Sequence, residues 1–142
     1  MSKQLNVALW VAQGALAALF LFAGGMKLVM PIATMTSQTP LPGAFIRFIG
    51  VAEVAGALGL ILPGLTGIRT ALTSLAAAGL VVIMIGAVSI TLTLPGRPML
   101  ALPAVTGILA ALVCYGRWQR VPLRPRARRH EGGRVRLAAG HA

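Results

Sequence analysis

Residues 44–62 read AFIRFIGVAEVAGALGLIL, and among these nineteen residues only Arg47 and Glu53 carry a charge. A helix of about 20 mostly apolar residues crosses the hydrocarbon core of a bilayer. Glu53 is the tenth residue of the run and therefore falls near the bilayer centre, where a charge costs roughly 2.5–3.5 kcal/mol on insertion scales. The stretch predicts a membrane span, and it raises the question of why that span contains a carboxylate.

The composition of the whole chain indicates the same class of protein. The chain has 142 residues, of which 57% are hydrophobic and 11% charged, and its mean hydropathy is +0.85. A soluble domain is about 25% charged, so a soluble globular domain is excluded. Three further apolar runs lie at residues 5–30, 68–94 and 99–117. Because a helix satisfies its own backbone groups in lipid, residues 1–118 are predicted to form an all-α, integral membrane four-helix bundle.

Prolines mark the ends of the predicted spans. Pro31 closes the first run, and residues 31–43 form the one substantial loop, because proline lacks the N–H that a helix needs. Pro63 and Gly64 predict a turn directly after Leu62, and residues 94–98 predict another. The first run is longer than the ~7–15 apolar residues of a signal peptide and has no A-x-A site, so we expect it to be retained.

Positive charge predicts the orientation of the bundle. Eight arginines lie at or beyond the end of the last apolar run: Arg117, Arg120, Arg124, Arg126, Arg128, Arg129, Arg134 and Arg136. With Lys3 and Arg69 they make ten positive residues on one side, against three (Lys27, Arg47 and Arg97) on the other. Cytoplasmic loops carry the excess of Lys and Arg. We therefore expect a multi-pass membrane protein with both termini in the cytoplasm.

Residues 119–142 are predicted to form a basic, disordered cytoplasmic tail, because they lack a hydrophobic pattern. Basic segments beside a span attract anionic lipid headgroups, and we expect Arg124, Arg126, Arg128 and Arg129 to do so. The net charge of +11 would suggest nucleic acid in a soluble chain. Here no aromatic stacking residue follows Trp118 and no nucleic-acid-binding motif is present, so nucleic acid is not an expected partner.

Small residues recur on the predicted spans at helical spacing. Helices in lipid associate through small residues that let their backbones approach closely. The second span places glycines at steps of three around Glu53, and the third places two at heptad spacing. The predicted packing glycines are Gly24, Gly50, Gly56, Gly59, Gly79 and Gly86.

Glu53 either stays protonated or faces a partner inside the bundle. Lys27 is the candidate ionic partner from the first span, and Gln13, on the same stripe of that span, is a candidate neutral partner. Lys27 lies near the outer end of its helix and would usually extend toward water. Arg47 lies six residues from Glu53, about 240° around the helix, so the two do not share a face. A structural polar contact and a ligand site at Glu53, Lys27 and Gln13 both remain open.

The residues that carry most redox and metal chemistry are scarce in the predicted spans. Cys114 is the single cysteine, so an intrinsic dithiol centre is excluded, and a packing role is expected for it. The only histidines, His130 and His141, lie in the tail. No metal site, no catalytic residues and no cofactor other than a possible bound quinone are therefore predicted.

Two stretches carry a family resemblance: FLFAGGMKLVMP at residues 20–31 and LPGAFIRFIGVAEVAGALGLILPGLTGIR at residues 41–69. They resemble the DoxX-like family of small four-span bacterial membrane proteins, over roughly residues 5–115. The resemblance implies a four-helix bundle in a bacterial inner membrane, with Lys27 and Glu53 as part of the pattern to test. Relatives in the wider group are linked to thiosulfate:quinone oxidoreductase membrane subunits and to membrane complexes in oxidative-stress defence.

Two functions follow as expectations. The first is an accessory or scaffold subunit of a membrane system, with a quinone-linked redox system as one option, and with a membrane protein partner or a second copy of the chain. The alternative is a small proton-coupled transporter of lipophilic compounds that uses Glu53. Small multidrug resistance transporters carry their key glutamate in the first span, and they have midplane aromatic residues that this chain is expected to lack. Catalysis by the chain alone is the third and least supported option.

Overall fold

The structure is a computed structural model that describes residues 2–96 and 99–124. Its elements are the helices α1 (Ser2–Val29), α2 (Ile32–Thr36), α3 (Gly43–Thr66), α4 (Ala71–Thr93) and α5 (Ala101–Tyr115), followed by the π-helical turn η1 (Gly116–Arg120). Four of the helical segments, the last running through η1, are long and apolar enough to span a membrane. The described residues contain no strand. The predicted all-α, integral membrane four-helix bundle is confirmed.

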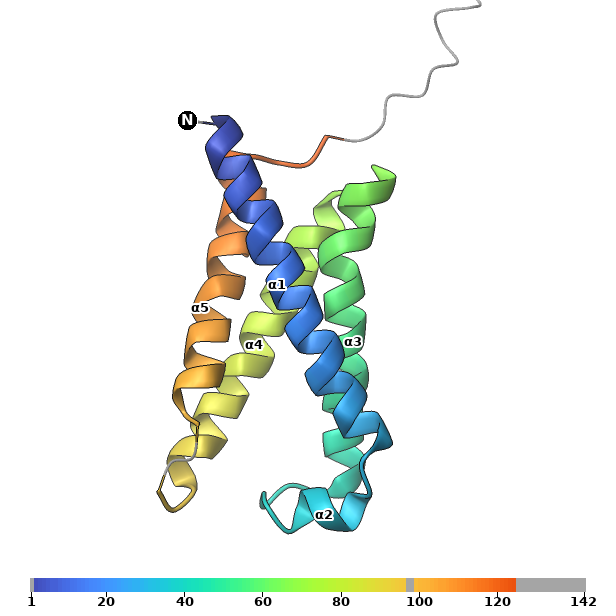
Figure 1. Cartoon of the computed structure of the whole chain (residues 1–142), viewed down its shortest axis with the longest axis vertical. Coiled ribbons are helices and arrows are strands. Elements are labelled where there is room, and N and C mark those ends of the chain that lie inside the picture. The colour runs from blue at the N-terminus through green and yellow to red at the C-terminus, as the bar shows by residue number, and fades with distance from the viewer. Residues whose placement is uncertain (1, 97–98, 125–142) are drawn as a thin grey trace, which may run out of the picture.

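The helices pack in a chain of neighbours (Figure 1). Helix α1 packs mainly on α3, α3 also packs on α4, and α4 packs on α5, while α1 and α5 share fewer contacts. Helix α1 runs diagonally from the C-terminal end of α5 to the N-terminal part of α3. At the end of the bundle where α2 lies, α1 and α3 are on one side and α4 and α5 on the other.

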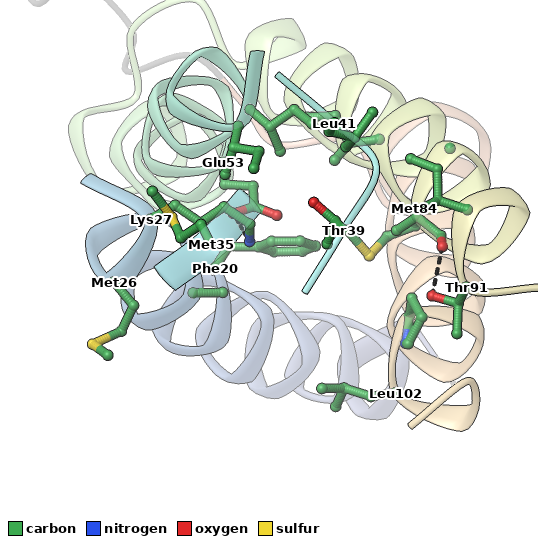
Figure 2. Close-up of a pocket in the computed structure, with 18 of the residues that line it drawn as sticks. Phe20, Met26, Lys27, Met35, Thr39, Leu41, Glu53, Met84, Thr91 and Leu102 are labelled. Carbon is green, nitrogen blue, oxygen red and sulfur yellow. Dashed lines mark hydrogen bonds and ion pairs between the residues drawn. The ribbon is translucent and has the colours of Figure 1, made fainter. Parts of the chain in front are cut away.

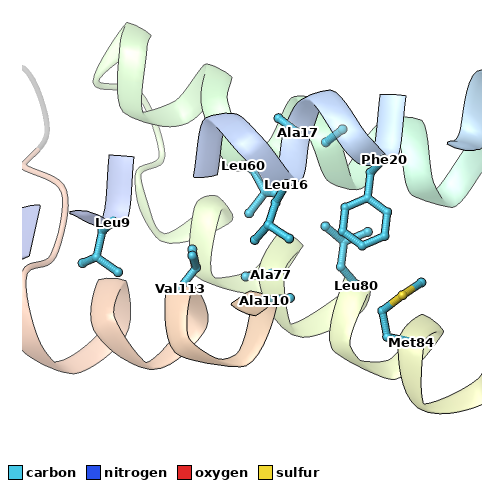
Figure 3. Packing of buried hydrophobic residues seen from close by; sticks show 11 residues of the cluster. Leu9, Leu16, Ala17, Phe20, Leu60, Ala77, Leu80, Met84, Ala110 and Val113 are labelled. Atoms are coloured by element: carbon cyan, nitrogen blue, oxygen red, sulfur yellow. The ribbon is translucent and has the colours of Figure 1, made fainter. Parts of the chain in front are cut away.

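The apolar core lies where the four long helices meet (Figure 3). Its largest fully buried apolar side chains are Phe20 and Leu16 of α1, Leu60 of α3, Leu80 of α4 and Val113 of α5. The outer faces of the same helices carry exposed large apolar side chains. In lipid these outer faces need no protein cover, so the bundle interior depends on packing and polar contacts for its specificity.

Helices α1 and α3 approach each other most closely at Gly24 and Gly50. A Cβ atom added to Gly24 would lie 2.7 Å from the carbonyl oxygen of Gly50, and one added to Gly50 would lie 3.1 Å from the carbonyl oxygen of Gly24. Two backbones can meet in this way only when both positions lack a side chain. The pair explains why glycine stands at both sites.

The other predicted packing glycines divide into two groups. A Cβ atom on Gly56 or Gly59 would lie 2.7 Å from a side chain of α4, so both glycines lie at the α3–α4 contact. A Cβ atom on Gly79 or Gly86 would meet no atom within 4 Å. These two glycines therefore do not lie at a close helix contact, in contrast to the expectation. Heptad spacing places residues on one face, but it does not say which way that face points.

Several boundaries also differ from those expected. The turn predicted at Pro63 is wrong, because α3 continues through Pro63 and ends where Gly67 takes a left-handed conformation with φ of 68°. The loop at residues 31–43 contains the short helix α2, and α4 begins at Ala71. Residues 119–120 belong to η1, and residues 125–142 of the predicted tail lie outside the described residues.

Candidate functional site

Lys27 of α1 and Glu53 of α3 form an ion pair. The Nζ atom of Lys27 lies 2.8 Å from Oε2 of Glu53, to which it donates a hydrogen bond. The Glu53 side chain is 3% exposed and that of Lys27 is 31% exposed. The structure thus brings together two of the three residues of the predicted polar site, and the more deeply buried of the two is the acid.

The close approach of α1 and α3 positions this pair. A Cβ atom on Gly24 would lie 3.1 Å from the Cβ of Glu53, and one on Gly50 would lie 3.0 Å from the Cβ of Lys27. Each charged side chain therefore starts above a glycine of the opposite helix. The two glycines give the side chains the space in which their charged ends meet.

Arg47 holds the end of α1 against α3. Its Nη1 donates to the carbonyl oxygen of Lys27 at 2.8 Å, and its Nη2 donates to that of Met30 at 2.9 Å. The last carbonyls of a helix have no partner within that helix, and a cation there also interacts favourably with the helix dipole. Sequence reasoning found only that Arg47 is turned away from Glu53, because spacing along α3 says nothing about the end of α1.

A cavity of about 670 Å³ lies beside the ion pair, between α1 and α3 on one side and α4 and α5 on the other. Helix α2 and the loop that follows it also contribute to its wall. The lining is mostly apolar, and the residues labelled in Figure 2 are Phe20, Met26, Lys27, Met35, Thr39, Leu41, Glu53, Met84, Thr91 and Leu102. Sequence reasoning did not predict a cavity of this size, and Phe20 places an aromatic side chain in the same lining as Glu53, where none was expected.

Thr39 adds an unsatisfied polar group to this lining. Its hydroxyl is buried and has no hydrogen-bond partner among the described residues. Figure 2 shows this hydroxyl turned toward Glu53 across the cavity. Buried polar atoms without a partner are rare and call for an explanation.

Gln13 lies at a different site from the ion pair. It is fully buried, and its Nε2 donates to the carbonyl oxygen of Leu60 at 2.6 Å. Its Oε1 accepts a hydrogen bond from Nε of Arg117, also at 2.6 Å. Gln13 therefore links α1 to α3 and to η1, and no hydrogen bond among the described residues joins it to Glu53. The candidate site is reduced to Lys27 and Glu53, with Thr39 added.

Arg117 was expected at the end of the last span, as one of the positive residues that set the orientation, yet it is only 3% exposed. Its Nη1 donates to Oδ1 of Asn6 at 2.7 Å, and its guanidinium lies 5.3 Å from the centre of the Trp10 ring. The π-helical turn η1 carries the chain past the end of α5, so that Arg117 points into the bundle. Asn6 and Gln13 are seven residues apart and share one face of α1, and this polar face was the available sequence signal.

The match to known proteins covers the ion pair and the whole cavity lining. A family model described as "DoxX-like family" matches residues 11–113. The chain belongs to the DoxX-like family. No curated protein and no solved structure matches the sequence. With its four candidate spans, this DoxX-like chain is a multi-pass membrane protein, and its matched region ends before Arg117.

Cys114 and Arg124 of this DoxX-like protein do not line the cavity. Cys114 is half-buried and its Sγ contacts the carbonyl oxygen of Ser74 at 3.4 Å. Across residues 2–96 and 99–124, no three His, Cys, Asp or Glu side chains gather as a metal site would require. Arg124 is exposed beyond η1. The other predicted lipid-binding arginines, Arg126, Arg128 and Arg129, lie outside the described residues.

Proposed function

We propose that this DoxX-like protein is an accessory subunit of a quinone-linked redox system in the bacterial inner membrane, and that it holds a quinone between its helices. The observation that carries the proposal is the cavity of about 670 Å³ beside Lys27 and Glu53. Small-molecule sites commonly measure roughly 300–1,000 Å³ and combine an apolar lining with a few polar groups. The cavity has both properties.

A quinone fits the chemistry of the lining. Its ring and isoprenoid tail are apolar, and Phe20, Met35 and Met84 offer the aromatic and thioether contacts that such groups favour. Its carbonyl oxygens accept hydrogen bonds, and Lys27 and Thr39 offer donors at one end of the cavity. A quinone is also soluble in the bilayer, so it reaches a site within the spans without crossing water.

A partner protein would supply the electrons. The described helices contain one cysteine and no cluster of metal-ligating side chains, so we assign electron delivery to another subunit and ligand binding to this one. The other candidate partner is a second copy of the chain. Co-purification of two differently tagged copies would reveal it.

We further propose that both termini lie in the cytoplasm, so that the cavity lies toward the outer half of the membrane. Lys3, Arg69, Arg120 and the exposed Arg124 support this orientation through the positive-inside rule. The basic residues after η1 would then contact anionic lipid headgroups. In a Cys114→Ala background, a cysteine at Ser2 should react with an impermeant maleimide only in inverted vesicles. Reaction in right-side-out vesicles alone would reverse the orientation.

Quinone binding can be tested by filling the cavity. Ala87 of α4 lines the cavity, whereas Ala55 of α3 is exposed on the lipid-facing side. The full chain is reconstituted in nanodiscs and titrated with a short-chain quinone by calorimetry. Ala87→Phe should weaken binding about tenfold or more, because the ring occupies the ligand volume, and Ala55→Phe should bind as the unmodified chain does. Absence of saturable binding by the unmodified chain would reject the proposal.

Proton-coupled transport is the second candidate, and the exposure of Glu53 to a cavity favours it. In small transporters a membrane-embedded acid exchanges protons with a lipophilic substrate. Proteoliposomes with an internal pH dye provide the test. Substrate-driven proton movement that is lost in Glu53→Gln would support transport. If the unmodified chain moves no protons with a panel of lipophilic amines, the accessory role is the better account.

A further inference from the structure

We propose that the polar end of the cavity, formed by Glu53, Lys27 and Thr39, binds the reduced, hydroxyl-bearing form of the ligand, a quinol, more tightly than the oxidised quinone. The inference rests on the proposed function and adds the redox state that the site prefers. It follows from which hydrogen-bonding positions remain unused at this end of the cavity.

Glu53 keeps an unused acceptor at the cavity. Its Oε2 receives the hydrogen bond from Lys27, and no hydrogen bond among the described residues involves its Oε1. Glu53 lines the cavity, and its unbonded Oε1 is not fully buried. A carboxylate can only accept hydrogen bonds. The group that completes this site must therefore offer a proton.

Lys27 and Thr39 offer the complementary donors. The Lys27 ammonium has three protons, and among side chains it donates one hydrogen bond, to Glu53. The Thr39 hydroxyl is buried without a partner and faces Glu53 across the cavity. A ligand hydroxyl can donate to Glu53 Oε1 and at the same time accept from Lys27 or Thr39.

A quinone carbonyl can satisfy only half of this arrangement. It accepts from Lys27 or Thr39, but it leaves Glu53 Oε1 without a donor and places a second partially negative oxygen nearby. Leaving a charged acceptor unpaired in a water-poor site is expensive, and hydrogen bonds to charged groups are stronger than neutral ones. Glu53 thus favours the form of the ligand that carries the proton.

The neighbouring charges do not offset this preference. Arg47 is the nearest further cation on α3, and its guanidinium is bound to the carbonyl oxygens of Lys27 and Met30. Glu53 is the only acidic residue in the described lining of the cavity. An anionic head such as a phosphate would be repelled by Glu53, and a lipophilic cation would compete with Lys27 for it. A neutral hydroxyl avoids both conflicts.

The test measures the dissociation constants of a short-chain quinol and of its matching quinone under anaerobic conditions, using the full chain in nanodiscs. We expect the quinol to bind about tenfold more tightly, the lower end of what a hydrogen bond to a charged group contributes. For a two-electron couple, tenfold tighter binding of the reduced form raises the potential of the bound couple by about 30 mV.

Two variants separate the role of Glu53 from general damage. Glu53→Gln supplies an amide that both donates and accepts, so the preference for quinol should fall to less than about threefold while quinone still binds. Thr39→Val removes the buried hydroxyl, a donor to either form of the ligand, so it should weaken the binding of both forms and show that the ligand head lies at this end of the cavity; Thr36→Val is its control. The Thr36 hydroxyl is exposed and bonds only to carbonyls of its own helix. If Glu53→Gln does not fold, the ratio of the quinol and quinone dissociation constants in the unmodified chain still decides the preference.

The outcomes distinguish the inference from the proposed function. Equal binding of the two forms, or tighter binding of quinone, overturns the preference for quinol but leaves quinone binding intact. Failure of both forms to bind overturns both proposals. Quinol preference that survives in Glu53→Gln also overturns the inference, because another group would then be its cause.

Discussion

Replacing Gly24 with alanine should separate α1 from α3. The new Cβ would lie 2.7 Å from the carbonyl oxygen of Gly50 and 2.9 Å from a methyl group of Val54. Non-bonded carbon atoms prefer about 3.5–4.0 Å, so the helices must move apart by roughly half an ångström or more. Overpacking of this kind costs about 1–3 kcal/mol. The upper half of that range is expected, because the obstacle is a backbone atom that cannot rotate away.

Gly25 provides a control on the same helix. A Cβ atom on Gly25 would meet nothing within 4 Å, so Gly25→Ala gains the helix propensity of alanine, about 1 kcal/mol at most, without a clash. The difference between the two variants cancels this propensity and isolates the packing cost. Gly24→Ala should therefore be about 2–3 kcal/mol less stable than Gly25→Ala.

The measurement is equilibrium unfolding of the full chain in mixed micelles, followed by circular dichroism and Trp fluorescence. Gly24→Ala should unfold at lower denaturant than the unmodified chain, and Gly25→Ala at equal or higher denaturant. If the two variants unfold within about 0.5 kcal/mol of each other, a difference typical of substitutions that touch nothing, the close approach of α1 and α3 does not exist as described.

Three further predictions concern the buried polar contacts, and the same unfolding assay checks each of them. Lys27→Met should destabilise the bundle more than Glu53→Gln, by up to about 3 kcal/mol, because it leaves a buried carboxylate without a partner. The double variant should recover part of this loss. Equal destabilisation by the two single variants would argue against the ion pair. Arg117→Lys should cost about 2 kcal/mol, since an ammonium cannot reproduce the planar donors that reach Gln13 and Asn6, and an unchanged midpoint would place Arg117 in solvent. Arg47→Gln should cost about 1 kcal/mol by leaving the end of α1 less well capped, and faster hydrogen exchange limited to the last turn of α1 would locate the effect.

The sequence predicted the spans because their cause is local. Apolar runs of membrane-crossing length must form helices in lipid, and this holds whatever the neighbours are. Pro63 shows the limit of local reasoning. Proline stops many helices, but within a membrane bundle a neighbouring side chain can satisfy backbone groups near it. The carbonyl that Pro63 leaves without a helix donor is that of Gly59, and Gln13 of α1 donates to the next one, the carbonyl of Leu60.

The candidate site was only partly predictable for the same reason. The small-residue pattern and the rarity of charge in the spans point to Lys27 and Glu53, because few other residues could meet. Thr39 lies in a loop, and its place at the cavity depends on how α2 turns the chain, which no periodicity encodes. Arg117 follows an apolar run and looks like a membrane-surface residue until the π-helical geometry of η1 is known.

The hydrogen bonds from Leu60 through Gln13 to Arg117 join residues that are synthesised at different times. During insertion into the membrane, the amide of Gln13 enters the bilayer before either of its final partners has been made. An unpartnered polar group in hydrocarbon costs several kcal/mol, so the first span remains incompletely stabilised until the end of the last one emerges from the ribosome. A chain that stops short of η1 would leave the side-chain oxygens of Gln13 and Asn6 without the donors of Arg117. Membrane proteases that extract loosely packed helices would then remove unfinished copies and spare completed ones.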